Sequence, residues 1–312
     1  MEGFLRGALT AEETALLDSA AAFSERTVRP NANEWERARR QPVEALREAA
    51  SLGLLRLETP TEQGGLGHRY LVKLALCEEM SRADMAFTFS MVNTQNVAAR
   101  LALSPAARHR DEHVPALISG GIFGATALSE PGAGSDFSAI RTRAEKAEGG
   151  WRLDGEKAWI TNASIADLFI TYVQTDPAAG WRGIACFLVD ARKPGFTRRP
   201  AYDLMGGHAI GAGGFALENY IASEDDMIAP MSPPCVRGCL AMRSKPRSAT
   251  ARNATPSANP CSTIRGSTGR SAMSRTTSKP CAALSRMRAG SSTARKMPSW
   301  PPPTPRNSPA AS

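Results

Sequence analysis

The stretch ALSEPGAGSD, Ala127–Asp136, combines residue types that can bind a ligand through the backbone. Gly132 and Gly134 allow neighbouring backbone N–H groups to converge, and Ser135 adds a hydroxyl donor. A nest of this kind suits an anionic or carbonyl-rich ligand. The alternative is an ordinary turn that closes a hairpin, and the spacing alone leaves both interpretations open.

A second stretch, GEKAWITNA, spans residues 155–163 and places Trp159 two residues before Thr161. In a regular strand this spacing puts both side chains on one face. A flat aromatic ring beside a hydroxyl can lie against a flat heteroaromatic ligand and form a hydrogen bond with its edge. A tryptophan that only fills the core is the alternative interpretation.

Two glycine patterns resemble a dinucleotide-binding fingerprint, which needs G-x-G-x-x-G between a strand and a helix. The pattern at Gly132 lacks the third glycine, and the pattern at Gly211 leads into a strand. The G-x-S-x-G motif of a nucleophile elbow is absent. These patterns therefore favour neither a Rossmann domain nor a serine hydrolase.

Possible metal ligands are few and poorly spaced. His109 and His113 are four positions apart, but Arg110 stands where an H-E-x-x-H site needs glutamate. We therefore expect this pair on a solvated helix face. Cys235 and Cys239 form no tight C-x-x-C pair, so with Cys261 and Cys281 they do not indicate zinc.

The elements that must position these stretches change type along the chain. Thr10 and Glu13 form a capping-box pattern, which predicts a helix from this point. Apolar spacing, proline and glycine signals predict further helices. The predicted helices are Pro42–Gly53, Tyr70–Glu79, Asp84–Leu101 and Ser104–Ser119.

After Gly120 the pattern becomes that of short strands. The predicted strands are Ile122–Leu128, Trp151–Asn162 as a hairpin that turns at Asp154-Gly155, Leu168–Thr175, Gly183–Asp190 and Phe215–Ile221. Because no long helices separate them, we expect an antiparallel sheet or barrel. The predicted fold class is α+β, with an all-α N-terminal domain followed by a β-barrel-like domain.

Charge divides the chain at residue 226. The first 226 residues hold all 30 Asp and Glu and 24 Lys and Arg, whereas residues 227–312 hold 14 Lys and Arg and no acid. From about Met231 the sequence loses periodicity and is dominated by Arg, Ser, Ala, Pro and Thr. We therefore predict domains at 1–120 and 121–230, followed by a disordered basic tail at 231–312.

Four segments together resemble the acyl-CoA dehydrogenase family: LETPTEQGGLG (57–67), CEEMSRAD (77–84), GATALSEPGAGSD (124–136) and GEKAWITN (155–162). Their order and spacing agree with the family, and the resemblance covers roughly Leu5–Pro230. It implies an N-terminal helical domain, a middle β domain and a C-terminal four-helix domain. It also implies FAD as cofactor and a homo-oligomeric assembly.

The resemblance also assigns roles to residues of this chain. It implies that the cofactor-binding residues are Thr126, Leu128, Ser129, Gly134, Ser135, Trp159, Ile160 and Thr161. Trp159 would cover the flavin ring, and the Thr161 hydroxyl would meet its reactive nitrogen edge. Ser135 would also approach the acyl-CoA substrate. Thr126 stands where the family often has an aromatic residue, and Ser129 where it often has threonine.

The implied reaction is α,β-dehydrogenation of an acyl-CoA thioester, with electrons passed to an electron-transfer flavoprotein. A carboxylate must remove the α-proton while the β-hydride goes to flavin. In the family this glutamate comes from the C-terminal domain, but no acid follows Asp226 here. No catalytic base is therefore assigned, and Glu130 and Glu156 are not substitutes by motif.

The tail itself offers an explanation in ARNATPSANP, Ala251–Pro260. Back-translated and read from each third base, this stretch permits A-E-R-x-A-F-G-K-P, which contains the family's C-terminal R-x-x-F-G-x-P. We therefore hypothesise a frameshift between about Ile228 and Arg252. The chain as written would then retain FAD weakly and show no dehydrogenase activity.

Two other functions remain as alternatives. An acyl-CoA oxidase-like flavoprotein would use the same fold. A non-catalytic remnant could instead bind nucleic acid through its basic tail, although the single aromatic residue there, Trp300, makes nucleic acid a less favoured partner. We expect no membrane span, because no run approaches 20 apolar residues, and no signal peptide, so a cytoplasmic location is expected.

Overall fold

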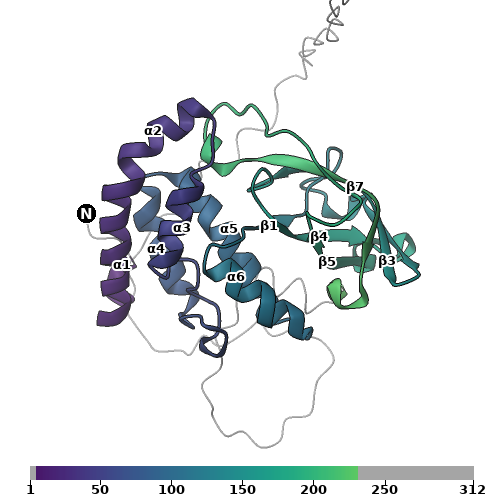
Figure 1. Ribbon diagram of the computed structural model, residues 1–312, viewed down its shortest axis with the longest axis horizontal. Coiled ribbons are helices and arrows are strands. Elements are labelled where there is room, and N and C mark those ends of the chain that lie inside the picture. Colours follow the sequence, from purple (N-terminus) through teal and green to yellow (C-terminus); the bar gives the residue numbers. More distant parts are fainter. Residues whose placement is uncertain (1–4, 231–312) are drawn as a thin grey trace, which may run out of the picture. The chain divides into compact units, whose positions relative to one another are not determined.

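The computed structural model describes residues 5–230, and these residues form one compact unit with the masses of helix and sheet in contact. The sequence predictions for residues 231–312, including the basic tail, its frameshift and its four cysteines, lie outside the described residues. Figure 1 shows the helices on one side of this unit and the strands on the other.

Within residues 5–230, six α-helices form the helical layer. They are α1 (Ala11–Phe23), α2 (Arg29–Ala38), α3 (Val43–Ser51), α4 (Tyr70–Ser81), α5 (Met85–Leu101) and α6 (Val114–Ile118). The predicted capping box is confirmed, because the Glu13 N–H donates to Thr10 Oγ1 and the Thr10 N–H donates to the Glu13 carboxylate. Asp84 caps α5 by accepting from the Ala86 N–H at 2.8 Å. Local side-chain chemistry thus sets where these helices begin.

Eight strands form one mostly antiparallel sheet. They are β1 (Gly124–Ala127), β2 (Arg143–Ala147), β3 (Gly150–Ile160), β4 (Leu168–Gln174), β5 (Ile184–Asp190), β6 (Phe196–Arg198), β7 (Gly213–Ala222) and β8 (Met227–Pro230). The strand order is β6-β7-β3-β2-β4-β5-β8, and β1 pairs with β4 in parallel. The predicted fold class is confirmed, with β1 and the short contact of β2 with β4 as its parallel pairings.

The predicted hairpin turn at Asp154-Gly155 is wrong, because both residues lie inside β3. The turn falls instead at residues 148–149, and β2 pairs with β3 directly before and after it. Gly155 sits at an irregularity in the pairing of β3 with β7, with φ 148°. A Cβ on Gly155 would lie 2.6 Å from the Thr142 Cα, so glycine serves close backbone packing here rather than a turn.

Residues 5–230 contain four apolar clusters, of which the smallest packs Leu17 against Val72 and Ala75. Trp35, Phe23 and Phe87 lie at the centre of the helical cluster, where the Trp35 and Phe87 ring centroids are 5.8 Å apart. A second cluster packs Leu101 and Leu117 of the helical layer against β4 and β5, and the third fills the sheet domain. The second cluster therefore joins helices to sheet by apolar burial.

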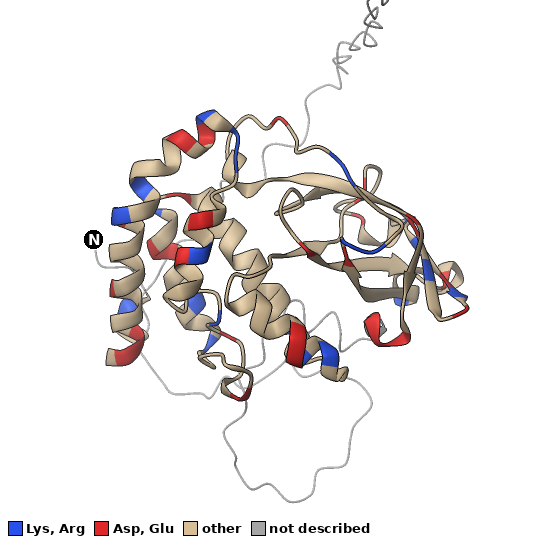
Figure 2. Cartoon of the chain, in the orientation of Figure 1, with Lys and Arg blue, Asp and Glu red and all other residues tan. Residues whose placement is uncertain are grey.

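Charged residues lie mainly around this framework rather than within it. Figure 2 shows acidic and basic residues together along α1–α3 and on the loops of the sheet domain. By contrast, α5 carries a single charged residue, Arg100, and buries one long face against its neighbours. Among residues 5–230, no helix is long and apolar enough to cross a membrane.

Candidate functional site

A hollow of about 200 Å³ lies between α5 and the ends of β1 and β3. Six of the eight residues predicted to bind the cofactor line it: Thr126, Leu128, Ser129, Trp159, Ile160 and Thr161. Helix α5 supplies the other wall through Phe89, Val92, Asn93 and Asn96. The structure therefore brings together two of the four segments that carry the family resemblance.

Close contact between α5 and β1 sets the width of this hollow. A Cβ on Gly124 would lie 2.6 Å from Val97 Cβ, so glycine lets the strand approach the helix. The Asn93 amide then bridges the two segments. It accepts from the Thr126 N–H at 3.3 Å and donates to the Thr161 carbonyl oxygen at 3.1 Å. One side chain of α5 thus fixes the backbone of both predicted segments.

Trp159 and Thr161 reach the hollow by a route that differs from the predicted one. Trp159 has φ 61° in an irregular part of β3, and the strand ends at Ile160. Simple strand alternation therefore does not place the two side chains on one face, and that expectation is wrong. Both residues still line the same hollow, and the Trp159 side chain is turned outward there, with 63 % of it exposed.

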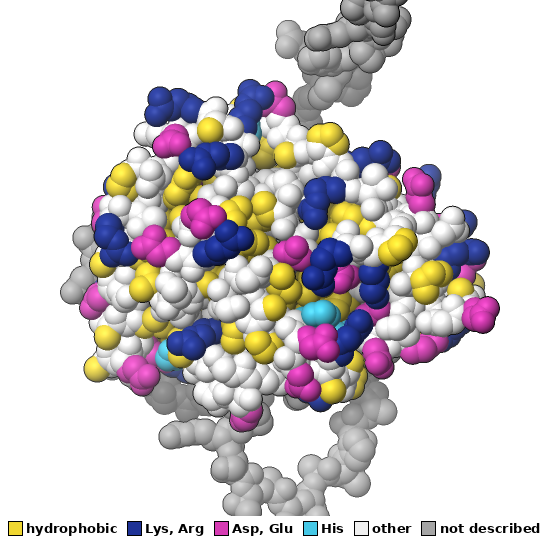
Figure 3. Space-filling model, viewed as in Figure 1, with side chains coloured by type: hydrophobic (Ala, Val, Ile, Leu, Met, Phe, Trp, Pro, Cys, Tyr) yellow, Lys and Arg dark blue, Asp and Glu magenta, His cyan; other side chains and the backbone are white. Residues whose placement is uncertain are grey.

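Aromatic surface is exposed around the hollow. Trp159 is 63 % exposed and Phe89 is 54 % exposed, which is unusual for such large apolar side chains. Figure 3 shows hydrophobic side chains reaching the surface between charged residues on the face drawn. The Trp159 ring also packs on Tyr202 with a centroid distance of 4.5 Å, and Tyr202 lines a neighbouring hollow of about 420 Å³.

The polar groups of the hollow fit a flat ligand with hydrogen-bonding edges. Among residues 5–230, the hydroxyls of Thr126, Ser129 and Thr161 have no hydrogen-bond partner in the protein. Trp159 offers an exposed aromatic face beside them. An isoalloxazine ring combines a flat aromatic system with polar edges, so the residues present fit part of a flavin site.

The hollow is smaller than a complete cofactor site. Pockets for drug-sized ligands measure roughly 300–1,000 Å³, whereas this hollow measures about 200 Å³. The hollow alone is therefore too small to enclose a ligand of that size.

Gly134 and Ser135 do not line the hollow, although both were predicted to approach the cofactor. They lie on an exposed part of the loop between β1 and β2. Neither Gly132 nor Gly134 has a positive φ, and a Cβ on either would meet no atom within 4 Å among the described residues. The loop is therefore open at this point, and its glycines leave its backbone accessible to a ligand.

Neither glutamate near the hollow is a free base. Glu130 is 7 % exposed and forms an ion pair with Lys157, with 2.8 Å between Oε1 and Nζ. Burial raises the pKa of the Glu130 carboxyl, but the charge and hydrogen bond of Lys157 and further hydrogen-bond donors lower it more, leaving it below its ordinary value. Glu156 points to Arg199 on the surface, with 3.6 Å between Oε1 and Nε.

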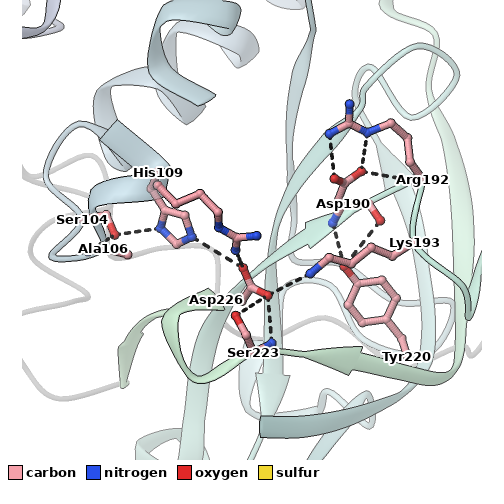
Figure 4. Close-up of polar contacts among 10 residues, drawn as sticks. Ser104, Ala106, His109, Asp190, Arg192, Lys193, Tyr220, Ser223 and Asp226 are labelled. Atoms are coloured by element: carbon pink, nitrogen blue, oxygen red, sulfur yellow. Dashed lines mark hydrogen bonds and ion pairs between the residues drawn. The ribbon is translucent and has the colours of Figure 1, made fainter. Parts of the chain in front are cut away.

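The expectation of a solvated face for His109 and His113 is wrong. His109 is fully buried and His113 is 9 % exposed, and their rings stack with centroids 5.9 Å apart. Figure 4 shows His109 between Ser104 and Asp226, with 2.8 Å from Nδ1 to Ser104 Oγ and 3.5 Å from Nε2 to Asp226. Within residues 5–230, no group of three His, Cys, Asp or Glu side chains could hold a metal ion.

The sequence interpretation missed the α5 wall of the hollow. Asn93 and Asn96 belong to a helix rich in uncharged polar residues, several of which are buried, and this composition was the available signal. The Asn96 oxygen Oδ1 accepts from buried Lys73 at 2.5 Å, and Lys73 also donates to Glu58 at 2.6 Å. Polar groups from α4 and α5 therefore meet behind this wall.

Comparison with known families agrees with this arrangement. The acyl-CoA dehydrogenase N-terminal domain matches residues 10–121, and the acyl-CoA dehydrogenase middle domain matches residues 125–220. The two matches cover the helical layer and most of the sheet domain. The chain belongs to the acyl-CoA dehydrogenase family, of which these residues form the N-terminal and middle domains.

Individual relatives point to the same family. The chain is 32 % identical over 214 residues to mitochondrial 2-methylacyl-CoA dehydrogenase of Solanum tuberosum, covering 68 % of this chain and 52 % of the relative. It is 35 % identical over 203 residues to mitochondrial isovaleryl-CoA dehydrogenase of Pongo abelii, covering 64 % and 48 %. The chain thus spans about half the length of the curated relatives that it matches.

A solved structure shows the same fold. Butyryl-CoA dehydrogenase from Megasphaera elsdenii superimposes with a TM-score of 0.67 and 27 % identity, covering 71 % of this chain and 59 % of that one.

Proposed function

We propose that this chain carries the flavin-facing half of an FAD-dependent oxidoreductase that desaturates an acyl-CoA thioester between its α and β carbons. The observation that supports this proposal most is the single hollow in which Ser129, Trp159 and Thr161 meet, although they come from separate segments. Bound flavin would accept the β-hydride of the substrate. The relatives' names favour a short or branched acyl group.

Each residue in the hollow has a task in this proposal. Trp159 would cover one face of the ring, and the hydroxyls of Ser129 and Thr161 would donate hydrogen bonds to its polar edges. Leu128 and Ile160 would add apolar contact, which excludes water from the reacting atoms. Gly134 and Ser135, on the open loop, would meet the cofactor and the acyl-CoA from outside the hollow.

We further propose that the chain as written does not turn over. Removal of the α-proton needs a carboxylate beside the substrate. Glu130 is already engaged by Lys157 and by two backbone N–H groups, and residues 227–312 contain no Asp or Glu. An electron-transfer flavoprotein as acceptor, a homo-oligomer and a cytoplasmic location are proposals that follow from the family.

The first test is a titration of the purified chain with FAD, followed by flavin fluorescence. We expect weak saturable binding, and Thr161→Ala should weaken it roughly 2- to 10-fold, the worth of one ordinary hydrogen bond. Thr197→Ala on β6 is the matched control, because Thr197 is exposed and does not line the hollow.

The second test adds a panel of short and branched acyl-CoA thioesters to the FAD-loaded chain without oxygen. We expect the flavin absorbance to persist, because the base is missing. Bleaching with any thioester would overturn the proposed inactivity. Absence of saturable FAD binding would overturn the flavin site itself.

A further inference from the structure

The loop that carries Ser129 is fastened by a buried ion pair that the proposed chemistry does not use. Lys157 is completely buried within β3, and its ammonium donates to the Leu128 carbonyl oxygen at 3.2 Å as well as to Glu130. One side chain therefore holds the backbone directly before Ser129 and the side chain directly after it.

Glu130 closes the same loop from its other end. Its two carboxylate oxygens accept from the Arg141 N–H at 2.6 Å and the Thr142 N–H at 2.9 Å. The residues between them form the open part of the loop that carries Gly134 and Ser135. A single carboxylate thus binds both ends of the loop, and these hydrogen bonds offset the entropy cost of closing it.

The pair also lies where β3 leaves its regular path. Lys157 pairs with Phe215 of β7, the next paired residue is Ile160, and the two residues between them form the irregular part that contains Trp159. The Ala158 N–H donates to the Ser129 carbonyl oxygen at 3.0 Å. The ion pair therefore lies where the outward turn of Trp159 and the position of Ser129 are both set.

A buried ion pair of this kind is a costly way to add stability. Desolvation of two charges often cancels their attraction, and an apolar pair of similar volume can be as stable. Lys157 shows this cost, since burial lowers the pKa of its ammonium even though Glu130 acts in the opposite direction. The hydrogen bonds to three backbone groups give the pair a geometric role that an apolar pair would lack.

We propose that the Glu130–Lys157 ion pair is a positioning pair that holds Ser129 and its loop against β3 in the geometry that receives flavin. This inference rests on the proposed function. The pair touches neither substrate nor cofactor, and it acts through the backbone of residues 128–130 and 158. Its loss should alter flavin affinity by more than its effect on folding explains.

The test measures FAD affinity and unfolding free energy for Lys157→Met, Glu130→Gln and the double variant. Lys157→Met leaves a buried carboxylate unpaired, so the single variant should lose both stability and at least 10-fold in FAD affinity. The double variant removes the unpaired charge, but the single glutamine oxygen can replace only one of the two carboxylate oxygens that accept from Arg141 and Thr142. We expect it to regain part of the lost stability but not FAD affinity.

Asp226→Asn is the matched control, because it also breaks a buried ion pair but shares no residue with the hollow. It should lower stability and change FAD affinity less than 2-fold. A double variant that regains full FAD affinity would overturn the proposal, as would an equal loss of affinity in Asp226→Asn. If Lys157→Met does not fold, Glu130→Gln alone supplies the comparison.

Hydrogen exchange of the FAD-free protein separates this inference from the proposed function. Loss of the pair should speed exchange at the amides of Arg141, Thr142 and Ala158, while Asp226→Asn should not. Unchanged exchange at these amides would overturn the positioning role. If the wild-type chain binds no FAD but these amides respond as expected, the proposed flavin site fails while the fastening of the loop stands.

Discussion

Asp226, directly before β8, forms an ion pair with Arg108 of the helical layer. The Asp226 carboxylate also accepts from Lys193 Nζ at 3.1 Å and from the backbone and side chain of Ser223, both at 2.9 Å. The carboxylate is 2 % exposed. A residue far from Arg108 in sequence therefore fastens the two layers together.

This cluster predicts an acid-sensitive component of stability. Burial raises the pKa of Asp226, but hydrogen bonds from His109 and Ser223 and the charge of Lys193 lower it more, so it lies well below its ordinary value. Because the folded-state pKa is depressed, the stabilisation is complete above the unfolded pKa of about 3.9 and is lost as the pH falls through the folded one.

Asp226→Asn should therefore lower the free energy of unfolding at neutral pH by roughly 3–5 kcal/mol. Its urea midpoint should also vary less with pH below 4 than that of the wild type. Asp18→Asn is the control, because Asp18 is 60 % exposed in its pair with Arg6 and should cost at most about 1 kcal/mol. Equal pH dependence in the wild type and Asp226→Asn would contradict this prediction.

Asn162 predicts a second stability effect, because it ties the helical layer to the segment that ends in Thr161. Its amide accepts from Ser90 Oγ at 2.5 Å and donates to the carbonyl oxygens of Ser90 and Gly124. The residue is fully buried and has φ 64°, a left-handed conformation that asparagine tolerates.

Asn162→Gly removes the amide but keeps that backbone conformation, and Asn162→Ala loses both. We expect Asn162→Gly to cost roughly 2–4 kcal/mol from the unpaired buried groups. Asn162→Ala should cost about 1 kcal/mol more, from left-handed strain. Urea unfolding of both variants measures the difference, and an alanine variant as stable as the glycine variant would show that the backbone conformation is not strained.

His113 predicts an effect in a higher pH range. Burial lowers the pKa of its imidazole, and the charges of Arg108 and His109 lower it further, while Asp190 and Glu112 act in the opposite direction. Below the unfolded pKa of about 6.5, the unfolded chain binds a proton at His113 more readily than the folded chain does. The free energy of unfolding therefore decreases as the pH decreases. His113→Gln should reduce the change in unfolding free energy between pH 7 and pH 5. His68→Gln is the control. A slope unchanged in His113→Gln would assign this pH range to another group.

The sequence predicted where helices begin better than it predicted which of their faces are buried. The helix starts at Thr10 and Asp84 depend on side chains within three residues, so the sequence signals them directly. The burial of His109 depends on Asp226, more than a hundred residues away, and no helical periodicity reports such a partner. Buried and solvated faces cannot be distinguished from spacing when the covering residues come from another layer.

In the candidate site, too, the sequence signalled local motifs but not contacts between layers. The family resemblance of the short motifs predicted Ser129, Trp159 and Thr161 as cofactor-binding residues, and all three line the hollow. The wall from α5 and the outward turn of Trp159 depend on packing between layers and on an irregular strand pairing. Asp154-Gly155 misled the prediction for a related reason, since a dipeptide typical of a hairpin turn here allows close packing on Thr142.

The exposed apolar residues of α4 and α5 predict self-association of the chain. Tyr70 and Leu74 on α4, and Met85 and Phe89 on the neighbouring α5, are each more than 40 % exposed and are spaced one helical turn apart. Large exposed apolar side chains on neighbouring helices favour association in water. The double variant Leu74→Gln, Met85→Gln should therefore lower light scattering at high protein concentration, with a stability change within about 1 kcal/mol because both side chains are at the surface.

Leu103→Gln, which alters one exposed apolar residue beyond the end of α5, should have a smaller effect. Scattering that stays at the wild-type level in the double variant would show that this face does not drive association.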